Sequence, residues 1–206
     1  MKLTSYTKSL HIALRNQKTQ LFLRCLSSDS GELLDVGGDF GMNGEFLPMY
    51  SRFHNVTILN RQAPDRRALS NSHIKFIQGD GCDMPFEDRQ FDWVFSNAVI
   101  EHVGGWDKQK RFANEIRRIA KHGYFVATPN RYFPVEPHTY LPFYQFLPTV
   151  CQHFVVRFSP GWERTWNQID LLSARQLRIL FPDAEVLPVG PIPVKPNLIA
   201  FARYES

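Results

Sequence analysis

The sequence predicts an α/β protein built on a doubly wound, mostly parallel sheet of about seven strands with helices on both faces. Short apolar segments alternate with helical segments along the chain, as is typical of parallel sheets. The first apolar segment ends in Asp35, and a turn with Gly37, Gly38 and Gly41 follows it. Glycine permits positive φ and close approach of a ligand to the backbone, so this turn indicates a nucleotide-binding strand-turn-helix unit. The last two apolar segments are expected to close the sheet with an antiparallel strand.

Length and composition predict one domain with a single sizeable core. The chain has 206 residues, of which 43% are hydrophobic and 21% charged, the balance of a globular protein. No uninterrupted apolar run approaches the roughly 18–20 residues that a membrane span needs. Residues Met1 to Asn16 lack the apolar block and cleavage site of a signal peptide. We therefore expect no transmembrane segment and a cytoplasmic location.

The cysteines and the charge exclude several kinds of site. Cys25, Cys82 and Cys151 are far apart and form no CxxC pattern, so we expect reduced thiols, with no disulfide and no metal site. The net charge is +4 and the pI about 9.0. Basic residues between Lys108 and Lys121 alternate with acids on a predicted helix, which indicates a solvated face. No stable nucleic-acid complex is expected.

The first two thirds of the chain supply most of the predicted elements. The spacing of Leu10, Leu14, Leu21 and Leu23 predicts one or two leading helices over Ser5–Leu26. Further helices are predicted at Met42–Tyr50 and Trp106–Ala120, the second with its apolar residues on one face. Predicted strands are the apolar segments Glu32–Val36, Val56–Leu59, Ile74–Ile77, Phe91–Ser96 and Tyr124–Ala127, the last of which is stopped by Pro129.

The last third of the chain differs from the rest in amino-acid composition. Residues 129–160 are rich in proline and aromatics, and we interpret 129–172 as an insertion that lies over the carboxyl edge of the sheet. Ser173 is expected to cap a helix at Ala174–Leu180. Two closing strands are predicted at Glu185–Val189 and Asn197–Arg203. The single domain would then comprise leading helices (1–30), a cofactor-binding core (31–128), the insertion and a closing segment (173–206).

Three blocks of the sequence resemble the class I methyltransferases that use S-adenosylmethionine, most closely the type 11 small-molecule group. The blocks are LLDVGGDFG, FIQGDGCDMPFEDRQFDWVFSNAVIEHV and HGYFVATPN, and they occur in the order found in that family. The resemblance covers roughly Gly31 to Asn130, and the second block is the most specific. It implies a Rossmann-like fold and S-adenosylmethionine as the cofactor.

The resemblance also implies roles for individual residues. Asp35 and the glycine loop would lie beneath the methionine and ribose, Asp80 would accept from the adenine amino group, and Asn97 would lie near the methionine end. The chain departs from the family in two places. Asp39 replaces the central loop glycine, and Asn60 replaces the acid that would bind the ribose hydroxyls. The full predicted cofactor set is Asp35, Gly37, Gly38, Gly41, Asn60, Arg61, Asp80, Gly81, Cys82 and Asn97.

Two histidines are the predicted catalytic residues. The resemblance implies that Glu101 and His102 lie at the mouth of the pocket, and His138 follows two prolines in a loop beyond the fifth predicted strand. A histidine can remove a proton from a hydroxyl acceptor near neutral pH, whereas an amine acceptor needs a base less. For His102, packing against the turn before Gly104 is the structural alternative.

Several alternatives stay open from the sequence. Asp39 and Asn60 also suit a non-catalytic relative that keeps the fold as a binding module. Arg61 after a strand could hold the 2′-phosphate of NADP, although the glycine spacing is not GxGxxG. An RNA methyltransferase is a third hypothesis. The NRYFPVEPHTYLPF region resembles methyltransferase-like proteins of glycan and lipid biosynthesis, which implies a small-molecule acceptor such as a sugar or a lipid-linked glycan. The oligomeric state is left open.

Overall fold

The fold was analysed in a computed structural model of the whole chain. The structure describes residues 2–26, 31–38, 46–62, 73–156, 169–190 and 194–204. The central loop residues Asp39 and Gly41, and residues 42–45 of the helix predicted at Met42–Tyr50, lie outside these ranges. Of that helix the structure gives α2, Leu47–Tyr50.

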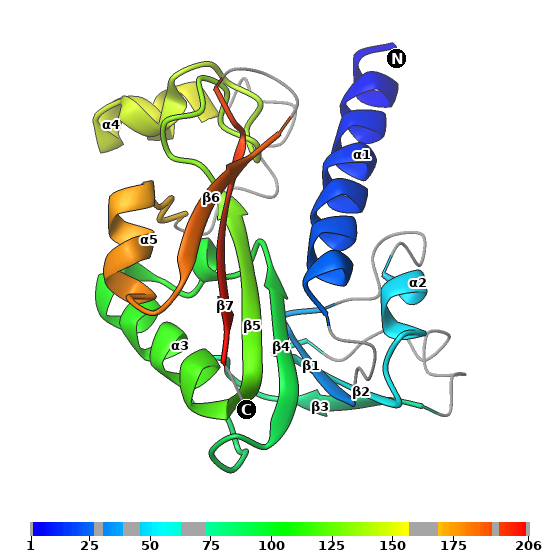
Figure 1. The fold of residues 1–206 in the computed structure, drawn as a ribbon. Helices are drawn as coiled ribbons and strands as arrows, with labels where there is room; N and C mark the ends of the chain where they lie inside the picture. The colour runs from blue at the N-terminus through cyan, green and yellow to red at the C-terminus, as the bar shows by residue number, and fades with distance from the viewer. Residues whose placement is uncertain are drawn as a thin grey trace.

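The described strands form one seven-stranded sheet with the order β3-β2-β1-β4-β5-β7-β6. Neighbours from β3 to β5 pair in parallel, and β7 runs antiparallel to both β5 and β6. Figure 1 shows α1 and α2 on one face of this sheet and α3 and α5 on the other. The predicted doubly wound sheet with an antiparallel last strand is confirmed, and it is the Rossmann-like fold.

The predicted elements occur with adjusted ends. Strand β5 is longer than expected, since Gly123 allows the chain to continue extended where the helix ends (φ +155°). The leading segment forms one helix rather than two. The strands are β1 (Glu32–Val36), β2 (Asn55–Asn60), β3 (Ile74–Gln78), β4 (Phe91–Asn97), β5 (Ala120–Pro129), β6 (Glu185–Val189) and β7 (Asn197–Arg203). The other helices are α1 (Lys2–Cys25), α3 (Gly105–Ile119), α4 (Thr149–Val155) and α5 (Ala174–Leu180), with short 3-10 turns η2 (Ile100–His102) and η3 (Tyr144–Phe146).

Two apolar layers cover the two faces of the sheet. Because successive side chains of a strand point to opposite faces, Leu33 and Leu34 of β1 enter different layers. On the α3 side, Phe112 and Ile116 recur at helical spacing and are fully buried. On the α1 side, Phe22 packs against the rings of β4 and β5, at 5.2 Å from Phe95 between centroids. This contact fixes the carboxyl-terminal part of α1 to the sheet.

The segment after β5 lies beyond the carboxyl ends of the central strands, as Figure 1 shows for the chain leading to α4. Its far end is tied back, since Asn130 bridges to Leu172 and the Asp170 amide donates to the Glu101 carbonyl at 2.8 Å. Ser173 then starts α5 with the predicted cap, here a full capping box with Gln176. Among the described residues, no helix combines the length and apolar character that a bilayer span would require.

Candidate functional site

The glycine turn after β1 is held by the end of β2. Gly37 has φ +81°, and its amide donates to the Leu59 carbonyl at 2.7 Å. Asn60 donates its side-chain amide to the carbonyls of Gly37 and Gly38, at 3.3 and 3.0 Å. Its side-chain oxygen accepts from the Gln62 amide at 3.1 Å. The Asn60 side chain therefore braces the turn from below.

Asp35 lies directly beneath this turn. Its carboxylate is buried and accepts a hydrogen bond from the Tyr50 hydroxyl of α2. A Cβ added to Gly38 would lie 2.5 Å from an Asp35 oxygen, closer than real Cβ contacts come. Glycine is thus required at residue 38 for the turn to close over the carboxylate, and the sequence prediction that these residues form one unit is consistent with this geometry.

Asp80 lies at the end of the neighbouring strand, β3, and is paired. Its carboxylate contacts the Arg61 guanidinium at 2.6 Å and accepts from the Cys82 amide at 2.9 Å. Burial acts to raise the pKa of Asp80, but these two donors outweigh burial and lower it. A Cβ on Gly81 would lie 2.8 Å from the Phe112 ring, so residue 81 is fixed as glycine by packing against α3. Arg61 thus faces Asp80, and an adenine amino group would share that carboxylate with it.

The end of β4 carries an unsatisfied polar atom. Among the described residues, no hydrogen-bond partner reaches the buried side-chain oxygen of Asn97. The next residue, Ala98, has φ +57°, a left-handed conformation that is uncommon for alanine. Unsatisfied buried groups and backbone strain gather at functional sites, where a ligand or a required geometry justifies them.

Glu101 on η2 is the most buried acid at this edge of the sheet. It is fully buried, and one carboxylate oxygen, Oε2, accepts from the Thr128 hydroxyl at 3.0 Å. Its other oxygen, Oε1, has no hydrogen-bond partner among the described residues. Burial raises the pKa of Glu101, while Lys18 of α1 is also buried and has a pKa lowered to about 8. The two charges attract one another across the interface between α1 and the sheet.

The two predicted catalytic histidines come together from distant parts of the chain. The rings of His102 and His138 meet edge to face with their centroids 4.8 Å apart. The Nδ1 atom of His138 lies 2.6 Å from Oε1 of Glu136, whose carboxylate also accepts from the Thr139 amide at 2.6 Å. Burial acts to lower the pKa of His138, but Glu136 raises it above its usual range. Burial, with His138 adding to it, lowers the pKa of His102 to about 4.

Sequence reasoning left two members of this arrangement out of the predicted catalytic set. Glu136 was considered together with His138 for a role in the site but was left out of the predicted catalytic residues. Lys18 carried no sequence signal, because Glu101, the acid whose charge acts on it, is far away in the sequence. The predicted cofactor residues at the ends of β1, β2 and β3 form one neighbourhood, while Asn97 lies on the side toward the histidines. Asp39 and Gly41 are outside the described residues.

The described residues fit a nucleoside cofactor with a polar tail. Asp80 offers carboxylate oxygens, and Asn97 offers an oxygen without a hydrogen-bond partner among the described residues. The turn itself is tightly packed, because Val99 and Asp35 occupy the space beside Gly37 and Gly38. These groups lie at the carboxyl ends of parallel strands, where open α/β sheets bind their ligands. The donor and acceptor set therefore suits the cofactor that the sequence resemblance implies.

Comparison with known proteins also indicates methyltransferases. The chain matches the family model described as a methyltransferase domain over residues 34–127. It is 28% identical over 160 residues to tocopherol O-methyltransferase of Arabidopsis thaliana, covering 71% of this chain and 44% of that protein. It is 30% identical over 104 residues to fatty-acid O-methyltransferase of Mycolicibacterium smegmatis, covering 48% of this chain and 37% of that protein. The chain thus spans less than half the length of these two relatives.

A solved structure shares the fold over nearly the whole chain. It is the 1,6-didemethyltoxoflavin-N1-methyltransferase of Burkholderia thailandensis with bound S-adenosylhomocysteine. It aligns with a TM-score of 0.63 at 14% identity, covering 98% of this chain and 87% of that one.

Proposed function

We propose that the chain, which matches the methyltransferase-domain family model over residues 34–127, is a class I S-adenosylmethionine-dependent methyltransferase that transfers a methyl group to an oxygen or nitrogen of a small-molecule acceptor. One observation carries the proposal. The glycine turn with Asp80 and the cluster of Glu101, His102 and His138 occupy the carboxyl ends of adjacent strands of one sheet. The site therefore has a cofactor side and an acceptor side that meet near Asn97.

S-adenosylmethionine is the cofactor of this family, and when bound it supplies a methyl group already activated by a sulfonium. We assign its binding to the backbone of Gly37 and Gly38, to the carboxylate of Asp80 and to the side chain of Asn97. Asn60 holds the turn in place, and Asp35 supports it from beneath. The protein's main task is then to orient the acceptor and exclude water.

The acceptor side supplies the groups that act on the acceptor's proton. We propose that His102 and His138 lie next to the acceptor atom and activate it, with Glu136 orienting His138 through Nδ1. Residues 129–156 of the insertion lie beyond the carboxyl ends of the central strands (Figure 1), which supports their role as a cover of the acceptor site.

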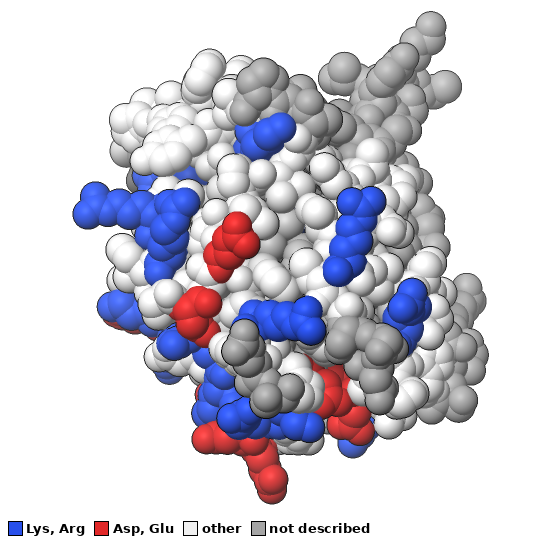
Figure 2. Space-filling view, viewed as in Figure 1, with Lys and Arg blue, Asp and Glu red and all other residues white. Residues whose placement is uncertain are grey.

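For the acceptor itself, we propose a lipid-linked molecule, with a lipid-linked glycan as the first choice. Figure 2 shows that the surface over α4 carries few charged side chains. Large apolar side chains are exposed along this insertion, at Tyr132, Phe143, Phe146, Val150 and Phe154. Such side chains suit contact with an apolar tail.

The separated cysteines, which are free in the described structure, favour action in the reducing cytoplasm.

The proposal is tested by isothermal titration with S-adenosylmethionine and S-adenosylhomocysteine, then by methyl transfer from labelled cofactor to a panel of alcohols, phenols, fatty acids and glycolipids. Micromolar binding of both ligands supports the function, and Asp80→Ala should weaken both, whereas exposed Asp107→Ala should not. Absence of binding of either ligand contradicts it.

A second candidate is a binding module without catalysis, and one observation favours it. The Asp80 carboxylate is already paired with Arg61, and the Asn60 amide already donates to the carbonyls of the glycine turn, so neither group is open to the cofactor. Cofactor binding without transfer to any panel member would support this candidate.

A further inference from the structure

Three side chains with metal-binding atoms converge where the acceptor side of the site lies. We propose that Glu101, His102 and His138 bind a divalent metal ion of the zinc class. The ligand atoms of all three lie within 4.8 Å of one another, a grouping found in the described part of the chain. They come from η2 and from the loop after β5, so the fold and not local sequence assembles them.

The spacing suits an ion of this size. Nε2 of His102 lies 4.0 Å from Oε1 of Glu101. Tetrahedral zinc with bonds of about 2.0–2.1 Å holds its ligand atoms about 3.3 Å apart. The ligand atoms would therefore have to move closer by about 1 Å on binding, a movement that side-chain rotation of the partly exposed His102 can supply.

Glu101 provides the independent observation that a ligand belongs here. The residue is fully buried, and Oε2 is satisfied by Thr128 while Oε1 has no hydrogen-bond partner among the described residues. A buried carboxylate oxygen without a partner is costly, and it is the kind of group that a metal ion satisfies. The open oxygen is also the one nearest to His102.

The ring nitrogen of His138 that would not bind the metal already has a carboxylate partner, as metal-binding histidines usually do. Its Nδ1 lies 2.6 Å from Glu136, and the Thr139 amide holds the same acid at 2.6 Å. A carboxylate on one imidazole nitrogen fixes the ring and the tautomer, and leaves the other nitrogen for the ion. Glu136 is itself buried, so this orientation is protected from solvent.

The donor set indicates both the ion and its use. Two imidazoles and one carboxylate are a catalytic zinc set, which leaves a position open for water or substrate. The use of that position rests on the proposed function. An acceptor hydroxyl that coordinates the ion has a lowered pKa and releases its proton to water, leaving an oxygen nucleophile. The inference therefore narrows the acceptor class to alcohols and phenols, in preference to amines.

The test begins with metal alone. The full chain is stripped with a chelator, dialysed, and titrated with Zn²⁺ by calorimetry and with Co²⁺ by visible absorption. We expect about one equivalent of either ion, with Co²⁺ bands typical of nitrogen and oxygen ligands. Binding of less than about a tenth of an equivalent to correctly folded protein would overturn the proposal.

Variants locate the ion. His102→Ala and His138→Ala should each weaken Zn²⁺ binding at least about 10-fold, and Glu136→Gln by about 10–100-fold through the outer contact. His153→Ala, on the exposed face of α4, is the matched control and should not change it. His102 is partly exposed, so His102→Ala is the informative variant if His138→Ala does not fold. Unchanged Zn²⁺ affinity and Co²⁺ spectra in His102→Ala would exclude this site.

Titration of the same stripped protein with S-adenosylmethionine separates this inference from the proposed function. Zn²⁺ binding without cofactor binding would sustain the metal site and contradict the function. Cofactor binding, with methyl transfer that chelator and added Zn²⁺ leave unchanged and no bound ion, would sustain the function and overturn the metal site.

Discussion

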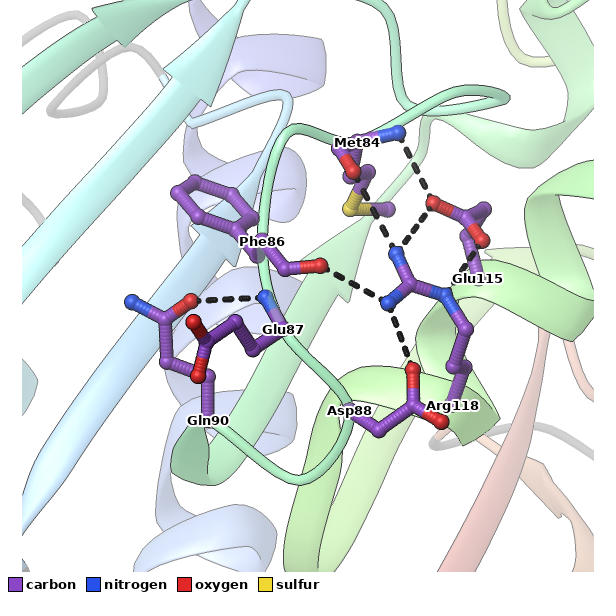
Figure 3. A network of polar contacts seen from close by, with 7 residues as sticks. All are labelled: Met84, Phe86, Glu87, Asp88, Gln90, Glu115 and Arg118. Carbon is purple, nitrogen blue, oxygen red and sulfur yellow. Dashed lines mark hydrogen bonds and ion pairs between the residues drawn. The ribbon is translucent and has the colours of Figure 1, made fainter.

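Two clusters of charged side chains in this protein differ in how completely they are hydrogen bonded and in how deeply they are buried. Figure 3 shows Arg118 of α3 surrounded by Glu115, Asp88 and the carbonyls of Met84 and Phe86. Arg118 donates to each of them at 2.7–3.3 Å, and Glu115 in turn accepts from the Met84 amide. Arg118 thus has four hydrogen-bond partners, and this cluster fixes the loop before β4 onto α3.

The cluster at the acceptor side leaves groups without partners instead. Glu101 Oε1 has no hydrogen-bond partner among the described residues, although its residue is fully buried. Lys18 and Glu101 are buried, whereas Arg118 is partly exposed and Asp88 is exposed. The hydrogen-bonded cluster therefore fixes one element onto another, while the open oxygen of buried Glu101 is the group that the proposed metal ion would satisfy.

The largest expected effect is on activity. Substituting His102→Ala should lower the rate of methyl transfer at least about 100-fold, because the acceptor loses an activating group. Its side chain is partly exposed and the structure gives it no hydrogen bond, so the free energy of unfolding should change by about 0.5 kcal/mol or less. The measurement is transfer of labelled methyl to the best acceptor in the panel, with a thermal melt beside it. A preserved rate would remove His102 from the site.

The next effect should fall on stability alone. Arg118→Met removes donors from Glu115, Asp88 and two carbonyls, and we expect a loss of about 1–3 kcal/mol in unfolding free energy. Affinity for S-adenosylmethionine should be unchanged. Urea unfolding measures the first quantity and calorimetry the second. Lys110→Met, on the exposed side of the same helix, is the control and should stay within about 0.5 kcal/mol.

A double-mutant cycle tests the buried pair. Lys18→Met removes the ammonium that attracts Glu101, so Glu101→Gln should cost less stability in the Lys18→Met background than in the wild type. We expect a coupling of about 1–2 kcal/mol from urea unfolding of metal-free protein. Additive effects would show that α1 docks through Phe22 and the apolar layer without help from this pair.

The smallest effect is a pH dependence of the Arg118 cluster. The bonds from Arg118 lower the pKa of Glu115 against burial, which raises it. A lowered folded-state pKa means that this stability is present above the ordinary glutamate pKa of about 4.3 and is lost as the pH falls through the folded value. Wild type should therefore lose more stability between about pH 5 and pH 3 than Glu115→Gln, measured by urea unfolding. Equal slopes would contradict this.

The residues proposed to bind the cofactor could be singled out from the sequence because their signals are local. Asp35 lies near the end of β1, the glycines follow that strand and Asp80 follows β3, so strand order brings them to one edge of the sheet. What could not be predicted is how these residues pair with one another. Arg61 turns toward Asp80 and Asn60 toward the glycine carbonyls, and these bonds depend on the distance between neighbouring strands.

At the proposed acceptor side, the sequence indicated Glu101 with His102 at the mouth of the pocket and His138 in a separate loop, without their mutual arrangement. That His138 is oriented by Glu136 and stacked edge to face on His102 follows from how the loop after β5 folds back over η2. The burial that separates the pKa values of the two histidines also arises there. Periodicity and spacing carry no information on either point.

The sequence by itself determined the doubly wound sheet, its antiparallel last strand, the glycine turn and the cap at Ser173, because hydrophobic period and turn chemistry act over a few residues. Only the tertiary structure brings Thr128 to Glu101, buries Lys18 within electrostatic range of that acid, and gathers His102 and His138 near a Glu101 oxygen without a hydrogen-bond partner among the described residues. Those contacts join residues from three separate parts of the chain, and their energies depend on burial, which arises only once the helices have covered both faces of the sheet.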